Sequence, residues 1–121
     1  MKNPRSTEAL NGLGKLHLEA GDFHVARLLF LRAQELGSRS AETFNGLGVV
    51  FWHLGRHQEA FFQFKKAWSI GKDKRAGLNL AALFNQYGNK AKAKAMAKQA
   101  GRVSRGDMQS GEFLPGARKL F

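Results

Sequence analysis

The sequence contains no cysteine. Disulfides, thiolate metal sites, a cysteine nucleophile and lipid attachment through an N-terminal cysteine are therefore excluded. No apolar run is long enough to span a bilayer, and residues 1–7 are polar, so the sequence predicts neither a membrane span nor a secretory signal. We expect a cytoplasmic protein, unless a targeting segment has been removed from a longer chain.

Residues that could carry catalysis or hold a metal are few and scattered. His53 and His57 are four apart, but Gly55 lies between them, so they flank a predicted turn and share no helix face. His17 takes a position expected to pack against the core, and His24 has no acidic neighbour at ligand spacing. No glycine-rich phosphate loop follows a strand. The sequence predicts neither an enzyme nor a metal, cofactor or small-molecule substrate site.

The sequence does contain an internal repeat. Asn-Gly-Leu-Gly occurs at residues 11–14 and again 34 residues later, at 45–48. Aligning residues 8–37 with 42–71 gives ten identities, where unrelated sequences of this composition would give roughly two. A third unit, one residue shorter, carries four of the repeated positions: Leu80, Phe84, Gly88 and Ala93. The chain is therefore predicted to be an array of three units.

Each unit has the pattern of two helices joined by a glycine turn. Apolar and small residues recur at helical spacing before Gly21, and the pattern resumes after it until Gly37. Glycine tolerates positive φ, so Gly21, Gly55 and Gly88 are predicted to be the turns. No segment shows the alternation of a strand. We expect an all-α fold with six helices, over residues 7–20, 23–36, 41–54, 57–70, 75–87 and 90–104.

Small residues lie in the middle of the first helix of each unit, where a glycine costs about 1 kcal/mol relative to alanine. Close approach of the second helix is the expected compensation. The small residues are Gly14, Gly48 and Ala81, and the small residues expected to face them are Ala26, Ala60 and Ala93. Large side chains should fill the space between successive pairs: Phe30, Phe51, Phe64 and Phe84.

These positions resemble the tetratricopeptide repeat (TPR) family. The resemblance covers roughly residues 7–103 and rests on Leu13-Gly14, Gly21, Ala26, Phe30 and Ala33 with their equivalents in the second unit. It implies an α-solenoid of three helix-turn-helix pairs over residues 1–104, with repeats at about 7–40, 41–73 and 74–104. The sequence departs from the family in two ways. The usual proline near the repeat end and the early tryptophan are replaced by other residues: Ser38, Lys72, Leu10 and Phe44.

The resemblance also implies where a partner would bind. First helices of TPR pairs line a concave groove, which here would receive Asn11, Lys15, Asn45, Val49, Trp52, His53, Arg75, Asn79 and Asn85. The asparagines at 11, 45 and 79 either form a ladder that pairs with a peptide main chain or are simply polar surface residues. Trp52 is either an anchor for the partner or packs against its neighbouring helices.

Some TPR proteins hold a C-terminal carboxylate with lysine, arginine and asparagine residues at defined positions. The present chain has Asn11, Gly46 and Asn79 at three of these positions, so we do not expect that mode of recognition. The Gly-Leu-Gly helices are also similar to those of TPR subunits of bacterial secretion, tight-adherence pilus and gliding assemblies. The resemblance as a whole predicts a non-catalytic adaptor or scaffold that binds a peptide segment or a protein face, with an acidic partner among the alternatives.

Positive charge is concentrated towards the C-terminus. The chain has 20 basic and nine acidic residues, a net charge of +11. Lys90, Lys94, Lys98 and Arg102 follow one another at i, i+4 spacing and form a basic stripe on the last predicted helix. The stripe is either a solvated outer face or a surface for electrostatic docking to nucleic acid, an anionic membrane or an acidic protein. Docking to nucleic acid or membrane is the alternative function.

Residues 105–121 form a tail unlike the repeats. Four residues prevent a long helix: Gly106, Gly111, Pro115 and Gly116. The tail nevertheless carries apolar residues: Phe113, Leu114, Leu120 and Phe121. We expect it to pack on the open end of the third repeat or in a groove, its own or that of a neighbouring copy, which would allow self-association. Folding back on the third repeat is favoured, because the terminal pair otherwise leaves apolar surface uncovered.

Overall fold

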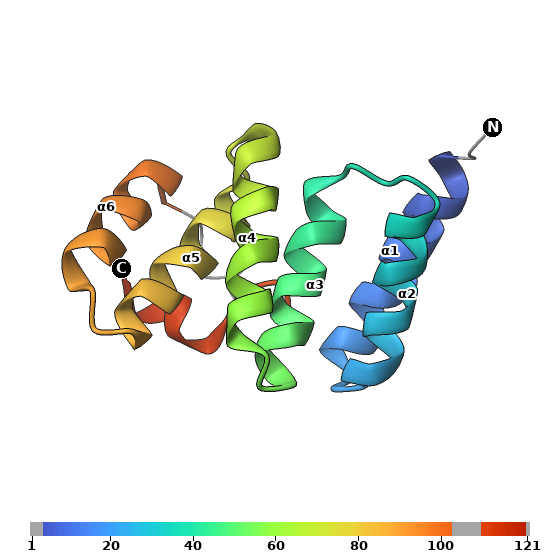
Figure 1. Cartoon of the computed structure of the whole chain (residues 1–121), viewed down its shortest axis with the longest axis horizontal. Coiled ribbons are helices and arrows are strands. Elements are labelled where there is room, and N and C mark those ends of the chain that lie inside the picture. The colour runs from blue at the N-terminus through green and yellow to red at the C-terminus, as the bar shows by residue number, and fades with distance from the viewer. Residues whose placement is uncertain (1–3, 103–109, 121) are drawn as a thin grey trace.

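The computed structural model describes residues 4–102 and 110–120, and within these ranges it contains helices and no strand. Three antiparallel helix pairs follow one another along the array (Figure 1). The pairs are α1 (Pro4–Glu19) with α2 (Phe23–Glu35), α3 (Ala41–His53) with α4 (His57–Gly71), and α5 (Lys74–Gln86) with α6 (Lys90–Ala100). A short 3-10 helix, η2 (Pro115–Leu120), follows in the tail. The predicted all-α fold is confirmed, and no described helix is long and apolar enough to cross a bilayer.

Glycine makes the turn inside each pair, as predicted. Gly21, Gly55 and Gly88 have φ values of 83°, 78° and 82°, in the left-handed region that residues with a Cβ avoid. Side chains cap the next helices: those of Ser40 and Asp73 accept hydrogen bonds from the backbone at the starts of α3 and α5. Local residues therefore fix the turn inside each pair and the starts of α3 and α5.

The last helix is shorter than predicted. It ends at Ala100 and not at residue 104, because Gly101 has a φ of 84° and its N–H closes the helix on the carbonyl of Ala97. Arg102 lies beyond this end, so it does not continue the stripe of Lys90, Lys94 and Lys98. Residues 103 and 104 lie outside the described residues.

Phenylalanine rings occupy the space made by the small residues of the first helices. A Cβ added at Gly14 would lie 2.8 Å from the Phe30 ring, and one added at Gly46 would lie 2.4 Å from the same ring. Phe64 takes the corresponding place against Gly48, at 2.4 Å. The alanines expected to face Gly14, Gly48 and the equivalent Ala81 are Ala26, Ala60 and Ala93. The alanines are buried, but the atoms nearest to the glycines belong to phenylalanine, whose flat ring needs a surface without side chains.

The first pair differs from the others in what covers it. Leu13 and Leu16 of α1 are 46% and 63% exposed, whereas their repeat equivalents Leu47 and Val50 are fully buried. Phe30 of α2 reaches α3 at Gly46, which shows how each later pair packs against the one before it. No described helix packs in this way on α1, so its two leucines remain in solvent.

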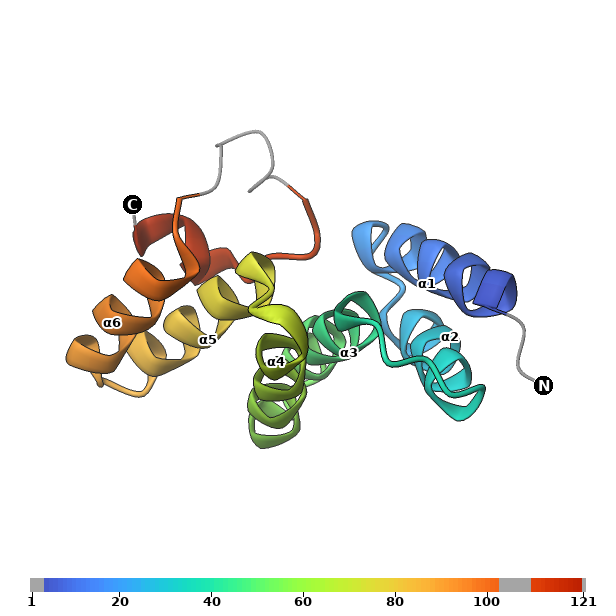
Figure 2. The same ribbon diagram turned by 90° about the horizontal axis from the view of Figure 1, so that it is seen from above.

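The first helices of the three pairs share one side of the array. Seen from above, α1, α3 and α5 lie towards the tail, whereas α2 and α4 lie on the opposite side (Figure 2). The tail contacts α5 through η2 and reaches α1 and α3 through residues 110–114. We call this side, formed by α1, α3 and α5, the inner face.

Candidate functional site

The backbone of the tail is hydrogen-bonded by two asparagines of the inner face. The carbonyl oxygen of Glu112 accepts hydrogen bonds from Nδ2 of Asn45 (3.0 Å) and Nδ2 of Asn79 (2.8 Å). The N–H of Leu114 donates to Oδ1 of Asn79 at 2.7 Å. Asn79 thereby pairs with the carbonyl of one residue and the N–H of the residue two further on, as a neighbouring strand would.

The orientation of both side-chain amides follows from these partners. A backbone N–H can only donate, so the atom of Asn79 facing Leu114 must be its oxygen. The nitrogen of Asn79 then faces the carbonyl of Glu112 and also donates to Oδ1 of Asn45 at 2.9 Å. This leaves the nitrogen of Asn45 facing Glu112 as well. Both asparagines are fully buried beneath the tail, and every orientation is consistent with the others.

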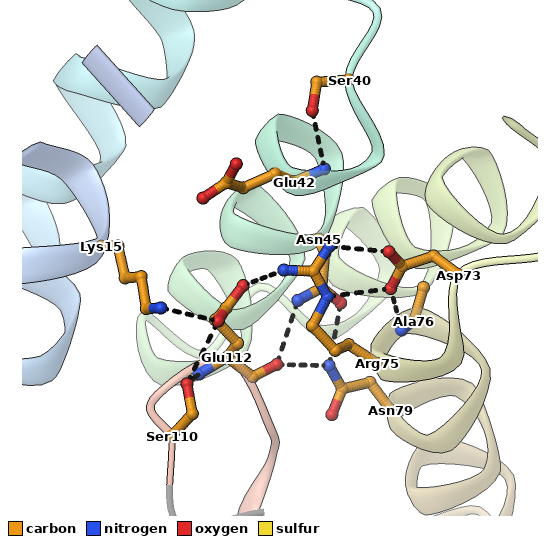
Figure 3. A network of polar contacts seen from close by, with 10 residues as sticks. All are labelled: Lys15, Ser40, Glu42, Asn45, Asp73, Arg75, Ala76, Asn79, Ser110 and Glu112. Atoms are coloured by element: carbon orange, nitrogen blue, oxygen red, sulfur yellow. Dashed lines mark hydrogen bonds and ion pairs between the residues drawn. The ribbon is translucent and has the colours of Figure 1, made fainter. Parts of the chain in front are cut away.

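The carboxylate of Glu112 lies between two cations from different repeats (Figure 3). Nζ of Lys15 on α1 lies 3.1 Å from one oxygen, and Nη1 of Arg75 on α5 donates to the other. The hydroxyl of Ser110 also donates to this carboxylate, at 3.2 Å. Glu112 is only 8% exposed. A buried carboxylate needs such partners, because burial without them carries a large desolvation cost.

Arg75 is held in place by Asp73. Its Nε and Nη2 donate to the two oxygens of Asp73, at 3.1 and 2.7 Å. Asp73 is also the N-cap of α5 and accepts from the N–H of Ala76. Burial would raise the pKa of Asp73, but its hydrogen bonds with Arg75 and the cationic charge of that residue outweigh burial and lower this pKa. The hydrogen bonds to Asp73 and the charge of Glu112 raise the pKa of Arg75, so the guanidinium stays charged.

The charge of Lys15 is stabilised in the same way. Its hydrogen bond to Glu112 and the charge of that residue raise the pKa of Lys15, against a smaller opposing effect of burial. Glu19 and Glu42 are close enough to raise this pKa further. Lys15 therefore reaches the tail as a cation, with acidic residues of α1 and α3 nearby.

Two apolar residues of the tail complete the contact. Phe113 is 6% exposed and Leu114 is fully buried, and both belong to the hydrophobic cluster that contains Val49 and Leu83. η2 then packs against α5, with Gly116 lying close to Ala82. The tail thus combines a backbone contact, a buried ion pair and an apolar contact. We call Lys15, Asn45, Arg75 and Asn79 the inner-face site.

The other residues predicted for the groove have different surroundings. Asn11 is buried and accepts a hydrogen bond from the hydroxyl of Thr43 at 2.8 Å, so it pairs within the array and not with the tail. Trp52 is half-buried, and its indole N–H donates to Gln86. His53 is exposed as a residue, but its ring stacks on Phe23 with centroids 4.2 Å apart, and this partial burial lowers the pKa of the imidazole. Asn85 is exposed on α5.

Three residues that take part in this contact, in addition to the inner-face site, were not singled out by the sequence. Glu112 and Ser110 lie in a segment without periodicity, and Asp73 lies between two predicted helices. The Asp-x-Arg spacing of Asp73 and Arg75 at the start of a helix was a usable signal, because an N-cap aspartate can hold an arginine two residues later. Among the described residues, no three histidine or acidic side chains gather as a metal site would require.

The basic stripe lies on α6. Lys90, Lys94 and Lys98 are all exposed there, and α6 itself contains no acidic residue. Lys92 is also exposed and places its Nζ 5.7 Å from the centre of the Phe84 ring. This helix therefore presents positive charge to solvent.

Comparison with known proteins identifies the family. The model of the tetratricopeptide repeat family matches residues 2–41 and 11–73, which together make up more than half of the chain. The protein belongs to the TPR family, in agreement with the resemblance seen in its sequence. No curated protein matches the chain at a significant level.

Two solved structures have the same fold. The crystal structure of MamA has a TM-score of 0.71 and 26% sequence identity, over 78% of the present chain and 56% of MamA, so the chain spans little more than half the length of that protein. The crystal structure of PcrH in complex with the chaperone binding region of PopB has a TM-score of 0.72 and 23% identity, over 81% of the present chain and 80% of PcrH.

Proposed function

We propose that this protein is a non-catalytic adaptor that binds a peptide segment of another protein on its inner face. The observation that carries the proposal is the pairing of Asn45 and Asn79 with the backbone of residues 112–114. Side chains that pair with a main chain are suited to an extended peptide, because every peptide offers the same carbonyl and N–H groups. The fold is compatible with this role, since PcrH was crystallised with a segment of another protein.

Selection of peptides from a random displayed library by the full-length protein tests the proposal. Lys15 is the best residue to change, because its side chain is 40% exposed and its loss should leave the fold intact. We expect Lys15→Ala to weaken the selected peptides by about tenfold, equivalent to about 1.4 kcal/mol, and Lys98→Ala to leave them unaffected. Peptides that bind both variants as tightly as the wild type would overturn the proposal.

Electrostatic docking through α6 is the second candidate function, supported by the exposure of Lys90, Lys94 and Lys98. It predicts association with any polyanion, lost as salt rises. Reversing the three lysines to glutamate should abolish binding to an unrelated duplex DNA and to anionic vesicles. If binding of these probes is unchanged by the reversal, or resists moderate salt, the stripe is a solvated surface and this candidate is excluded.

A further inference from the structure

The tail shows which chemical features the inner-face site accepts. Part of the contact is independent of sequence: Asn79 bonds the carbonyl of Glu112 and the N–H of Leu114, skipping the residue between them. The skipped residue, Phe113, is only 6% exposed. The site therefore fixes the register of a bound segment through its backbone and leaves its side chains to supply selectivity.

Selectivity enters through the residue whose carbonyl is bound. The carboxylate of Glu112 accepts from Lys15 and Arg75. The repeat array positions both donors, because Asp73 holds the guanidinium of Arg75 in place and Lys15 extends from another repeat. Net local charge does not explain the preference for an acidic residue, because Glu19 and Glu42 also lie near Lys15. The preference arises because Lys15 and Arg75 both direct a donor at the carboxylate of the bound segment. A segment with a neutral or basic residue here would leave Nζ of Lys15 and Nη1 of Arg75 without the carboxylate that accepts from both.

The next positions are apolar. Phe113 and Leu114 enter the hydrophobic cluster of the array, and Leu114 is fully buried. A polar side chain in the place of Leu114 would be buried without a partner. The site therefore fits an acidic residue followed by two apolar ones, which is the sequence of the tail at residues 112–114.

From these contacts we infer that residues 110–117 are an internal copy of the ligand, and that a partner segment of the form acidic-apolar-apolar binds by displacing them. The inference rests on the proposed function, since it concerns the same site. A tail that served only to cover apolar surface would need Leu114 and Ala117. It would not need a carboxylate between two cations, nor two asparagines on its backbone.

The tail is covalently attached to the array, and this attachment affects how its competition with a free peptide can be measured. The bound segment and the site belong to one chain, with residues 101–109 between α6 and Ser110 in the sequence, and a ligand attached through so few residues can reach an effective concentration of about a millimolar. A free peptide with the tail sequence should therefore bind the wild type weakly. Weakening the tail in the full-length chain should make the site available.

The first experiment measures binding of a fluorescent peptide with the sequence of residues 110–117 by anisotropy. The full-length variant Glu112→Lys replaces the carboxylate by a charge that Lys15 and Arg75 repel. We expect it to bind the peptide at least about tenfold more tightly than the wild type. Glu35→Lys makes the same change of charge at an exposed position of α2 and should behave as the wild type. A second peptide with lysine in place of its glutamate should lose at least about tenfold in affinity for the freed site.

The second experiment uses the wild type alone, so it does not depend on how well Glu112→Lys folds. The N–H of Leu114 is buried and donates to Asn79, and its hydrogen exchange should be slow. Adding a saturating amount of unlabelled peptide should accelerate this exchange, because the tail leaves the site. Unchanged exchange of Leu114 with the peptide bound would overturn the inference.

The outcomes separate the inference from the proposed function. One outcome is that library peptides depend on Lys15 and yet bind the wild type and Glu112→Lys equally. That result would support the adaptor function and show that the tail does not compete for the site. Equal binding of the acidic and lysine-containing peptides to Glu112→Lys would refute the acidic-apolar-apolar motif. If no peptide from either source depends on Lys15, the proposed function fails with the inference.

Discussion

Asn45 and Asn79 lie on the first helices of successive pairs, and the amide nitrogen of Asn79 donates to the amide oxygen of Asn45 at 2.9 Å. Both residues also donate to the carbonyl of Glu112. Two repeats thus present one joined set of donors and acceptors to a peptide backbone. Because each amide is held by the other, the site is ordered by the array as well as by the segment bound to it.

Replacing Asn79 by alanine should destabilise the protein. The change leaves the N–H of Leu114 and the oxygen of Asn45 without partners in a buried place. We expect a loss of about 2–4 kcal/mol in the free energy of unfolding, measured by urea denaturation. Asn85→Ala, at an exposed position of the same helix, should change it by less than about 0.5 kcal/mol. Similar values for the two variants would show that the network adds little stability.

Repeat-equivalent glycines should respond to alanine with opposite signs. At Gly46 the added Cβ would lie 2.4 Å from Phe30, whereas at Gly12 no atom lies within 4 Å. Gly46→Ala should cost about 1–3 kcal/mol through overpacking, and Gly12→Ala should gain about 0.5–1 kcal/mol through better helix propensity. Thermal denaturation of the two variants checks the difference, and a shift in the same direction for both would be inconsistent with the packing of Phe30.

Repeat-equivalent leucines should differ in the same way. Leu47 is fully buried between two pairs, whereas Leu13 is 46% exposed. Leu47→Ala should lower the free energy of unfolding by about 2–5 kcal/mol. Leu13→Ala should lower it by less than about 1 kcal/mol, because much of this side chain already contacts water. Urea denaturation measures both, and equal losses would mean that α1 is covered in solution.

Stability should fall in mild acid through His53. The residue is exposed, but partial burial of its ring against Phe23 lowers the pKa of the imidazole in the folded state below the ordinary value of 6.5. The unfolded chain therefore takes up the proton first, and stability that is present above pH 6.5 is lost as pH falls through the lowered pKa. Between about pH 7.5 and about pH 5.5, the wild type should lose more unfolding free energy than His53→Gln. Parallel losses in the two proteins would rule out His53 as the cause.

The helices could be predicted because their signals are local. Turn glycines such as Gly21 and Gly55 lie between runs of helical periodicity, and the repeat shows each pattern more than once. The end of α6 was predicted at residue 104 and not at Ala100, because a local pattern was given too much weight. The spacing of Lys90, Lys94, Lys98 and Arg102 favoured a continuous helix, whereas Gly101 ends it.

The tail contact could not be predicted in the same way. The carbonyl of Glu112 meets residues 33 and 67 positions earlier in the sequence, and its carboxylate meets Lys15 on the first helix. A segment rich in glycine has no periodicity to indicate which face it contacts. The equal spacing of Asn11, Asn45 and Asn79 was also misleading as a regular ladder. Asn11 bonds to Thr43, whereas Asn45 and Asn79 bond to each other. The third unit is one residue shorter, so Asn79 lies one position further along α5 than Asn45 lies along α3.

The most direct measurement of peptide binding on the inner face is the NMR signal of the side-chain amides of Asn45 and Asn79. In Glu112→Lys these signals should lie away from their wild-type positions, because the tail has left the site. Titration with the peptide of residues 110–117 should return both to the wild-type positions and leave the side-chain signal of Asn85 unchanged. If the peptide binds while the signals of Asn45 and Asn79 stay where they were, the inner face is not the binding site.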